Sequence, residues 1–448
     1  MPPEQVPPTR PASSRGDRPA PGGTAKRLLL LIPTTTYRTE DFVEAARRLE
    51  VDLVIASERP NVMASEFPDH LLSLPFNDPD AAARQVEALA RTRPIHAVVP
   101  VDDTTTVVGA AIAERLGLPS ANSVAAVSAT RNKLRMREML ARAGVPGPDH
   151  VAFSVTDDSR AAARRVSYPC VLKPLVLSAS RGVIRADDEA EFVAAFRRIA
   201  AILADPEVQA LGEGADRILV ERFIPGAEVA LEGLLNHGEL NTLALFDKPD
   251  PLDGPFFEET IYVTPSRLPA ETQRAIQVCA ARAATALGLQ DGPVHAELRL
   301  DSDGPWMLEI AARSIGGLCS RTLRFGTGLT LEEIILRHAL GLPIESLERE
   351  GRAAAVMMIP IPQGGILEGV EGLAEARAVP LIEDVTISAH TGQELVPLPE
   401  GFRYLGFIFS RADTPAEAEA ALRQAHACLR FVIRESAPRS ARTASAGG

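Results

Sequence analysis

Cysteine and positive charge are both scarce in this 448-residue sequence, and each shortage argues against a class of function. The four cysteines are far apart, so without a Cys-x-x-Cys pair they predict neither a zinc ribbon nor a disulfide framework. Reduced thiols agree with a cytoplasmic location. Acidic residues number 59 against 47 basic ones, which gives a formal net charge of −12. A basic excess is typical of proteins that bind nucleic acid, so we expect no such partner.

Long apolar runs and two common enzyme signatures are also missing. The run Leu28 to Ile32 is too short for a signal-peptide core or a membrane span, and we expect no membrane association. No Gly-x-Gly-x-x-Gly follows this run, which argues against a dinucleotide site. No Ser-His-Asp or Cys-His signature is present, so the sequence does not indicate a protein nucleophile.

The residues that are present predict three folded parts between two disordered ends. Residues 1–26 are rich in Pro, Gly, Ser and Arg and predict a disordered arm. From 27 to 122, short apolar runs alternate with helical patterns, which predicts an open parallel α/β domain. Residues 123–345 predict a mixed central domain, residues 346–433 a mostly β domain with a late helix, and residues 434–448 a disordered tail. The predicted fold class is therefore α/β and α+β, in several domains.

Two helices have readable ends. The stretch SATRNKLRMREMLARAG predicts one helix that closes on Gly144 before Val-Pro-Gly-Pro. Thr330 and Glu333 have the spacing of a capping box, which predicts a helix that runs to about Leu340.

A pair of strands around Asp-Ser-Asp-Gly-Pro places two acids face to face. If all five residues form the loop, one apolar face pairs Leu300 with Trp306, Leu298 with Leu308 and Ala296 with Ile310. The other face then carries His295, Glu297, Arg299, Met307, Glu309 and Ala311. Glu297 lies directly across from Glu309, and like charges in that position repel each other.

Two cations could relieve this repulsion. Arg299 lies on the same face, diagonal to Glu309, and could form an ordinary surface ion pair. A divalent metal is the alternative, because carboxylate oxygens suit Mg²⁺, which completes its shell with phosphate and water oxygens. The hairpin alone does not decide between them.

Other segments also allow both a functional and an ordinary structural interpretation. Lys173 ends the apolar strand CVLK and precedes the small-residue loop LSASRGV, where it could hold phosphate oxygens or simply mark a strand exit. Lys133 has the spacing of an exposed helical lysine. Glu221 and Glu228 flank an apolar turn and could bind an adenine amine and ribose hydroxyls, or belong to a solvated hairpin.

In order along the chain, these segments resemble the ATP-grasp superfamily of carboxylate–amine ligases. The resemblance spans roughly residues 26–433 and is strongest in TRNKLRMREMLARAGVPGP, YPCVLKPLVLSASRGV, LVERFIPGAEVALEG and the acidic hairpin. It implies a pre-ATP-grasp domain at 27–122, a nucleotide-binding domain at 123–345 and a lid-like domain at 346–433. FFEETIYVTPS and ARSIGG are most similar to the L-amino acid ligases, which join amino acids into dipeptides.

The resemblance implies roles for individual residues. Glu297 and Glu309 would bind Mg²⁺, or Mn²⁺ in its place, and Arg313 would stabilise an acyl-phosphate and the species formed after it. The residues implied to contact the phosphates, adenine or ribose of ATP are Lys133, Lys173, Ser180, Glu221, Phe223, Ile224 and Glu228. Those implied to face the substrates or a second metal are Glu259, Tyr262, Gly316 and Gly317.

The implied activity is ATP-dependent amide formation between a small carboxylate and a small amine, with release of ADP and phosphate. The resemblance implies amino acids as both partners. Two departures from the superfamily pattern stand out. Ala311 and Ala312 replace the usual Asn and Pro after the last metal acid, and the loop LSASRG has a single glycine. Alternatives are an ATP-grasp ligase of carboxylase or purine-biosynthesis type, or a catalytically silent nucleotide-binding protein. The sequence does not decide whether the protein forms a homodimer.

Overall fold

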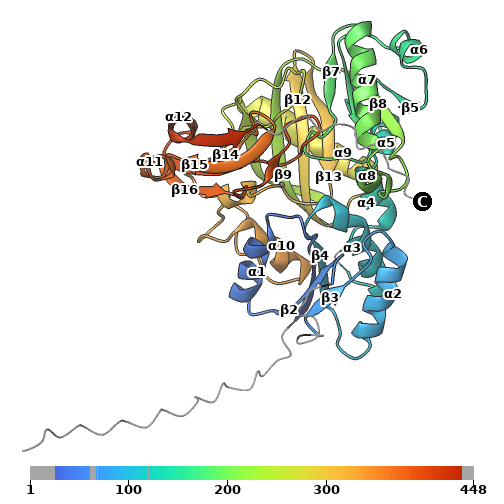
Figure 1. Ribbon diagram of the computed structural model, residues 1–448. Helices are drawn as coiled ribbons and strands as arrows, with labels where there is room; N and C mark the ends of the chain where they lie inside the picture. Colours follow the sequence, from blue (N-terminus) through green and yellow to red (C-terminus); the bar gives the residue numbers. More distant parts are fainter. Residues whose placement is uncertain (1–25, 61–66, 68, 120, 436–448) are drawn as a thin grey trace, which may run out of the picture.

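The computed structural model describes residues 26–60, 67, 69–119 and 121–435, and it confirms the predicted fold class. In Figure 1 the N-terminal part is blue and the part that follows it green, and the C-terminal part, orange to red, supplies strands to the central sheet. The predicted arm and tail fall almost wholly outside the described residues, although Arg434 still belongs to the last strand, β19 (Arg430–Arg434). Among the described helices, none is long and apolar enough to cross a membrane.

The N-terminal part is a parallel sheet of order β3-β2-β1-β4. Strand β1 is buried at every position, as expected where helices cover both faces of a sheet. The loops after β1 and β4 leave the same edge and both line the cavity described below. The elements are β1 (Arg27–Leu31), α1 (Thr39–Arg48), β2 (Asp52–Ser57), β3 (Leu71–Ser73), α2 (Pro79–Ala90), β4 (Ala97–Pro100) and α3 (Asp103–Leu116).

The single helix predicted before Gly144 is two helices. Helix α4 (Val124–Arg131) ends at Asn132, whose backbone is extended, and α5 (Lys133–Arg142) begins directly after it. The Asn132 side chain accepts a hydrogen bond from the N–H of Arg135, so it acts as the N-cap of α5. This break makes Lys133 the first residue of a helix, and Lys133 is buried instead of exposed.

A small antiparallel sheet of order β5-β8-β6-β7 follows, which we call the lid and which is distinct from the C-terminal domain at 346–433 that the resemblance implied to be lid-like. Its strands are β5 (His150–Ser154), β6 (Cys170–Pro174), β7 (Ile184–Ala186) and β8 (Arg217–Arg222), and its helices are α6 (Ser159–Ala163), α7 (Glu189–Leu203) and α8 (Pro206–Gln209). The loop between β6 and β7, residues 177–183, is the phosphate loop expected from LSASRGV. The two strands predicted around Pro225 separate here, because β8 belongs to the lid and the next strand to the central sheet.

The central sheet has eight strands in the order β13-β12-β9-β10-β11-β14-β18-β16. Its first half contains β9 (Ala227–Asn236), β10 (Glu239–Lys248), β11 (Ile261–Thr264), β12 (Gly292–Asp301) and β13 (Gly304–Ala311), with helix α9 (Ala270–Leu287) packed against them. A 3-10 turn, η1 (Cys319–Thr322), and α10 (Leu331–Ala339) complete this part. Both hydrogen bonds of the Thr330–Glu333 capping box are present, which confirms that helix start.

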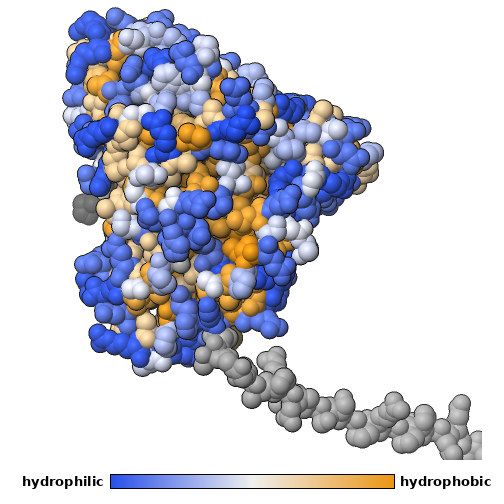
Figure 2. Space-filling model, turned by 180° about the vertical axis from the view of Figure 1, so that it is seen from behind, coloured by the Kyte–Doolittle hydropathy of each residue, from blue (hydrophilic) through white to orange (hydrophobic). Residues whose placement is uncertain are grey.

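The C-terminal part continues the central sheet. Strand β14 pairs with β11, so its strands extend the same sheet across the predicted boundary near residue 345. The strands that do so are β14 (Ala353–Ile359), β16 (Ile382–Ile387) and β18 (Gly406–Ala412). A second small sheet and two helices complete it: β15 (Gly365–Glu371), β17 (Glu394–Leu395), β19, α11 (Leu373–Ala378) and α12 (Pro415–Cys428). On the back of the molecule, hydrophobic side chains gather along the middle, between more hydrophilic ends (Figure 2).

The acidic hairpin is β12 and β13, and its predicted register is right at one end only. Glu297 pairs with Glu309 and Ala296 with Ile310, as predicted. Near the turn the prediction is wrong, because only Ser302 and Asp303 lie between the strands and Leu298 pairs with Met307. A bulge between these regions leaves Leu308 as the extra residue, which restores the register.

Candidate functional site

One cavity of about 360 Å³ lies where the N-terminal part, the lid, the central sheet and the C-terminal part meet. Every residue that the sequence singled out for a site lines it, although they come from distant segments. From the lid and its surroundings these are Lys133, Lys173, Ser180, Glu221, Phe223, Ile224 and Glu228; from the rest of the chain they are Glu259, Tyr262, Glu297, Glu309, Arg313, Gly316 and Gly317.

Two lysines enter the cavity from different elements. Lys133 Nζ, at the start of α5, donates to Leu177 O at 2.8 Å and lies 3.6 Å from a carboxylate oxygen of Glu309. Lys173 Nζ, near the end of β6, lies 2.6 Å from Glu221 Oε2. Lys133 is thus held at the phosphate loop and Lys173 at Glu221, and both line the cavity, where their ammonium groups could bind anionic oxygens.

Glu221 is more enclosed than its predicted contact with adenine requires. Its side chain is 2% exposed, and its other oxygen, Oε1, accepts a hydrogen bond from Arg137. Burial raises the pKa of Glu221, but Arg137 and Lys173 outweigh it and lower the pKa to about 2. Glu221 therefore stays charged and fixes Lys173, and its role toward adenine stays a prediction.

Arg137 joins this pair to the acidic hairpin. Its guanidinium also donates to the carbonyl oxygens of Met307, at 2.7 Å, and of Leu308. These carbonyls belong to the bulge of β13, so Arg137 stabilises the bulge directly. The bulge places Leu308 and Glu309 together in the lining of the cavity, while Met307 packs into the core with Leu298.

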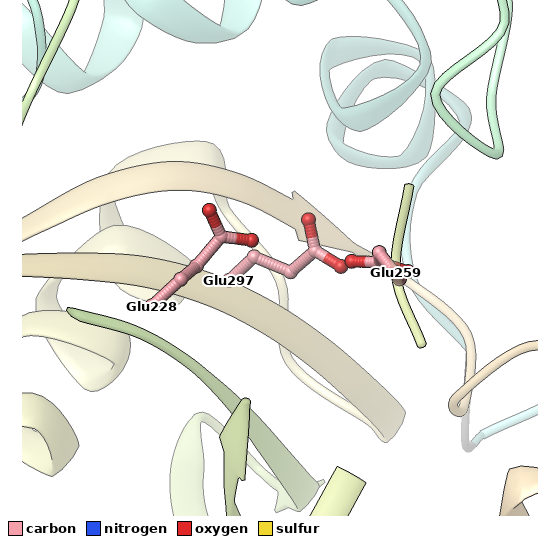
Figure 3. Close-up of side chains that lie close together, drawn as sticks. All are labelled: Glu228, Glu259 and Glu297. Carbon is pink, nitrogen blue, oxygen red and sulfur yellow. The ribbon is translucent and has the colours of Figure 1, made fainter. Parts of the chain in front are cut away.

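Three carboxylates gather at the centre of the site. Glu228 on β9, Glu259 before β11 and Glu297 on β12 each offer an oxygen within 4.8 Å of the others (Figure 3). The buried Lys248 ammonium at the end of β10 lies among them, 2.8 Å from Glu228 and 3.2 Å from Glu297, and also donates to Glu259. Burial lowers the pKa of Lys248, but the three acids outweigh it and raise the pKa well above its usual value.

His295 holds Glu297 from behind. Its Nε2 lies 3.5 Å from Glu297 and its Nδ1 lies 3.2 Å from the fully buried Glu232. Burial lowers the pKa of His295, whereas the bonds to the two acids raise it, with the net result a pKa of about 9. Glu232 also accepts from the N–H of Ile315, so it ties β12 to the loop after β13.

The donor set fits a hard divalent cation. Carboxylate oxygens of Glu297, Glu259 and Glu228 lie within 4.8 Å of one another around the Lys248 ammonium, so a metal ion bound there would share these acids with Lys248. Glu309 lines the same cavity. The predicted pair of Glu297 and Glu309 stays a prediction. The alternative of an Arg299–Glu309 ion pair is wrong, because Arg299 donates to Leu252 O and Gly226 O, both at 2.7 Å.

Arg313 is held in place by the N-terminal part. Its Nη2 donates to Asp103 Oδ2 at 2.8 Å, and Asp103 also lies 3.3 Å from Arg131. Burial raises the pKa of Asp103, but the two arginines outweigh it and keep the pKa well below its usual range. This acid, from the first residue of α3, therefore orients Arg313 while remaining charged.

The phosphate loop and the glycines shape the two sides of the cavity. Ala179 and Ser180 have positive φ angles of 53° and 55°, an uncommon backbone for residues other than glycine, which turns the loop tightly. Gly317 also has positive φ, and a Cβ there would lie 3.0 Å from the Phe407 ring. A Cβ on Gly316 would meet nothing within 4 Å, so this position leaves the space beside Arg313 open.

Phe223 and Ile224 line the far end of the cavity. The N–H of Phe223 donates to Pro169 O at 3.1 Å, so a backbone contact from this residue to adenine would use its carbonyl. The Phe223 ring lies between two guanidinium groups, with Arg185 at 4.2 Å and Arg299 at 4.8 Å from its centroid.

Three residues that pair with charged groups of the site were missed from the sequence, and two of them had a signal. Arg137 follows Lys133 by four residues, so the two share one face of α5. Lys248 precedes Pro249 at the end of an apolar strand, the same pattern that drew attention to Lys173 and Pro174. Asp103 had no local signal, because its partner Arg313 is 210 residues away.

Comparison with protein families assigns three segments of the chain. Residues 43–120 match the ATP-grasp N-terminal domain and residues 166–322 the ATP-grasp domain. Residues 357–434 match the L-amino acid ligase C-terminal domain 2. The three matches follow one another in the order that the sequence resemblance implied.

Individual relatives and a solved structure agree with this assignment. The alanine–anticapsin ligase of Bacillus subtilis is 30% identical over 236 residues, half of this chain and 49% of that protein. The match thus spans about half the length of that relative. A formate-dependent phosphoribosylglycinamide formyltransferase of Paraburkholderia xenovorans is 27% identical over 88% of this chain and 93% of its own length. The crystal structure of an L-amino acid ligase from Bacillus licheniformis superimposes with a TM-score of 0.74 at 28% identity, covering 92% of this chain and all of that one.

Proposed function

We propose that this chain, which belongs to the ATP-grasp superfamily of ligases, joins the carboxylate of one amino acid to the amine of another. ATP would be split to ADP and phosphate, with an acyl-phosphate as the intermediate. The observation that supports this most is the gathering of Lys133, Lys173 and Arg313 with Glu297 and Glu309 around one cavity. Such a set suits the transfer of a phosphoryl group to a carboxylate, in which charge must be balanced on several oxygens.

Each group has a task that its surroundings explain. Lys133 and Lys173 would bind the phosphates, because both line the cavity, Lys133 held at the phosphate loop and Lys173 at Glu221. Arg313, oriented by Asp103, would balance the negative charge that develops on the substrate side. Mg²⁺ held by Glu297 and Glu309 would neutralise phosphate charge. His295 keeps Glu297 in position, and Lys248 offsets the charge of the remaining acids.

The family comparisons support amino acids as the substrates. The C-terminal match is to a domain of the L-amino acid ligases, and the Bacillus licheniformis L-amino acid ligase covers almost the whole chain. The substrate side of the cavity is lined by Tyr37, Tyr262 and Tyr404. These rings offer an apolar surface with polar edges, which suits the side chains of amino acids.

Trapping the intermediate tests the proposal. With Mg²⁺–ATP, an accepted amino acid and hydroxylamine, we expect a hydroxamate to form in step with ADP, because acyl-phosphates react readily with hydroxylamine. A panel of amino-acid pairs should then give one amide per ADP, measured by mass spectrometry and phosphate release. A shift in melting temperature with ATP but no ADP release would instead identify a catalytically silent nucleotide-binding protein.

The near full-length match to a formyltransferase favours a second candidate, a ligase of purine-biosynthesis type. The same assay separates the two. ADP release with formate and phosphoribosylglycinamide, and none with any amino-acid pair, would replace the amino-acid ligase by this candidate.

A further inference from the structure

The phosphate loop is held from outside by a turn of the C-terminal part, residues 396–403, which we call the latch loop. The N–H of Gly182 donates to Pro399 O at 2.8 Å, and Arg181 Nε donates to Glu400 O at 3.0 Å. The Glu400 carboxylate accepts two hydrogen bonds from Arg198 on α7, at 2.6 and 2.9 Å. Residues of the lid and of the C-terminal part, more than 200 positions apart, are thus joined at the rim of the cavity.

The latch loop is itself a tight turn with little freedom. The N–H of Gly401 donates to Pro397 O at 2.8 Å, and a Cβ at Gly401 would lie 1.8 Å from Val396 O. The turn therefore presents Pro399 O and the Glu400 side chain as fixed acceptors.

The same turn leads directly into the substrate side of the cavity. Phe402, Arg403 and Tyr404 line the cavity, two to four residues after Glu400. The Arg181 guanidinium lies 5.5 Å from the centroid of the Phe402 ring, so the phosphate loop contacts this wall as well. One short segment thus touches both the loop expected to cover ATP and the surface expected to contact substrate.

Apart from the latch loop, two side-chain contacts hold the phosphate loop: Arg181 Nη2 lies 3.5 Å from Asp205 Oδ2, and Lys133 Nζ donates to Leu177 O. Arg181 N–H donates to Ser178 O and Val183 N–H to Ser180 O, but Ala179 and Ser180 have a strained left-handed backbone. An acyl-phosphate is destroyed by water, so a loop that covers it must stay closed while it exists.

We propose that Glu400 is a positioning residue that holds the phosphate loop closed over the acyl-phosphate by binding Arg198 on the lid. The role rests on the proposed ligase function for its chemistry. The structural part of the proposal, that the latch loop keeps the phosphate loop closed, depends only on the contacts described above. It can be tested without measuring activity.

The Glu400→Ala variant removes the carboxylate that binds Arg198 but keeps the backbone carbonyl that accepts from Arg181. It therefore tests the side-chain contact separately from the backbone contact. The Arg198 and Glu400 side chains are 44% and 43% exposed, so the pair contributes at most about 1 kcal/mol, or about a fivefold change in opening. Glu371→Ala is the matched control: Glu371 pairs with two nitrogens of Arg430 in the same part of the chain, far along the sequence from the latch loop.

Hydrogen exchange resolved to single amides measures the closure. We expect the Gly182 amide, which is bonded to Pro399 O, to exchange up to about fivefold faster in Glu400→Ala. The amides of Arg181 and Val183 are bonded inside the loop and should change less. Arg198→Ala should reproduce the effect from the other side of the pair, and Glu371→Ala should leave all three amides unchanged.

The ratio of ligated product to ADP released measures how well the acyl-phosphate intermediate is protected from water. We expect a ratio near one in the wild type and in Glu371→Ala, and a lower ratio in both Glu400→Ala and Arg198→Ala because water reaches the intermediate. If the exchange rate of the Gly182 N–H is unchanged in both latch variants, the proposal is overturned. It is also overturned if that N–H exchanges faster while the ratio of product to ADP stays at one. A wild-type protein that forms neither hydroxamate nor amide refutes the ligase function instead, whatever the exchange shows.

Discussion

Replacing Arg137 by methionine should destabilise the protein through three buried partners at once. The guanidinium is 2% exposed and donates to the equally buried Glu221 and to the carbonyl oxygens of Met307 and Leu308. Methionine can fill much of the volume but can donate to none of these oxygens. The variant Arg137→Met therefore leaves a buried carboxylate with Lys173 as its one remaining cation among these contacts.

The size of the loss follows from these contacts. Removing one partner of a buried ion pair costs about 3–5 kcal/mol, and each unsatisfied buried carbonyl costs about 1–3 kcal/mol. Lys173 and local rearrangement recover part of this, so we expect a decrease of about 3–5 kcal/mol in the free energy of unfolding. The double variant Arg137→Met with Glu221→Gln should lose clearly less than the sum of the two single changes, because the carboxylate that Arg137 balances is then neutral and the unpaired charge that remains is Lys173, which lines the cavity.

Urea unfolding followed by tryptophan fluorescence is a suitable assay. Trp306 is the chain's single tryptophan and precedes Met307 in β13, so it reports on the region that Arg137 stabilises. The pH dependence gives a second measure. Glu221 has a folded pKa of about 2 against a usual 4.5, so its stabilisation, on the order of 3 kcal/mol, is present above pH 4.5 and lost as the pH falls toward 2.

In Arg137→Met the loss of stability between pH 4.5 and 2 should be smaller, because one of the two cations that lower the pKa of Glu221 is gone. A single variant that costs less than about 1 kcal/mol would refute this account of the site. Strictly additive losses in the double variant would do the same, since they would show that Arg137 and Glu221 act independently.

Other substitutions test the remaining assignments. Lys173→Ala should raise the KM for ATP and lower kcat, because the lysine contacts phosphate before and during transfer. Glu309→Ala should lower kcat by roughly 10²-fold at all Mg²⁺ concentrations, and near-normal turnover would remove Glu309 from the metal site. Arg313→Ala should suppress hydroxamate and amide together, whereas loss of one product alone would contradict a shared role. Gly226→Ala should lower the melting temperature more than Gly212→Ala: both glycines have positive φ, but a Cβ on Gly226 would lie 1.9 Å from a backbone oxygen of β12 and one on Gly212 meets nothing within 4 Å.

Local patterns were sufficient for several parts of this molecule. The apolar run of β1, the Thr330–Glu333 capping box and the facing acids Glu297 and Glu309 each depend on residues a few positions apart. Helix ends and strand faces follow from such short-range chemistry, so they could be predicted. The break at Asn132 was missed because an N-cap inside a helical pattern resembles an ordinary polar position.

The bulge in β13 shows where local reasoning ended. The turn sequence allowed a five-residue loop. Contacts from outside the hairpin stabilise the extra residue: Arg137 on α5 binds the carbonyls of Met307 and Leu308, and the N–H of Met307 donates to Pro146 O at 2.9 Å. The register therefore depends on groups far away along the chain, with Arg137 about 170 positions from Met307.

The sequence by itself indicated a set of residues that all line the cavity, although not the whole lining, and that acids would face one another across a hairpin. Tertiary structure decided how those charges are paired: Glu221 with Arg137 and Lys173, Arg313 with Asp103, and three acids around Lys248. The reason is electrostatic. A charge removed from water takes the nearest opposite charge that the fold brings to it, and such neighbours come from segments whose distance in space cannot be read from their distance along the chain.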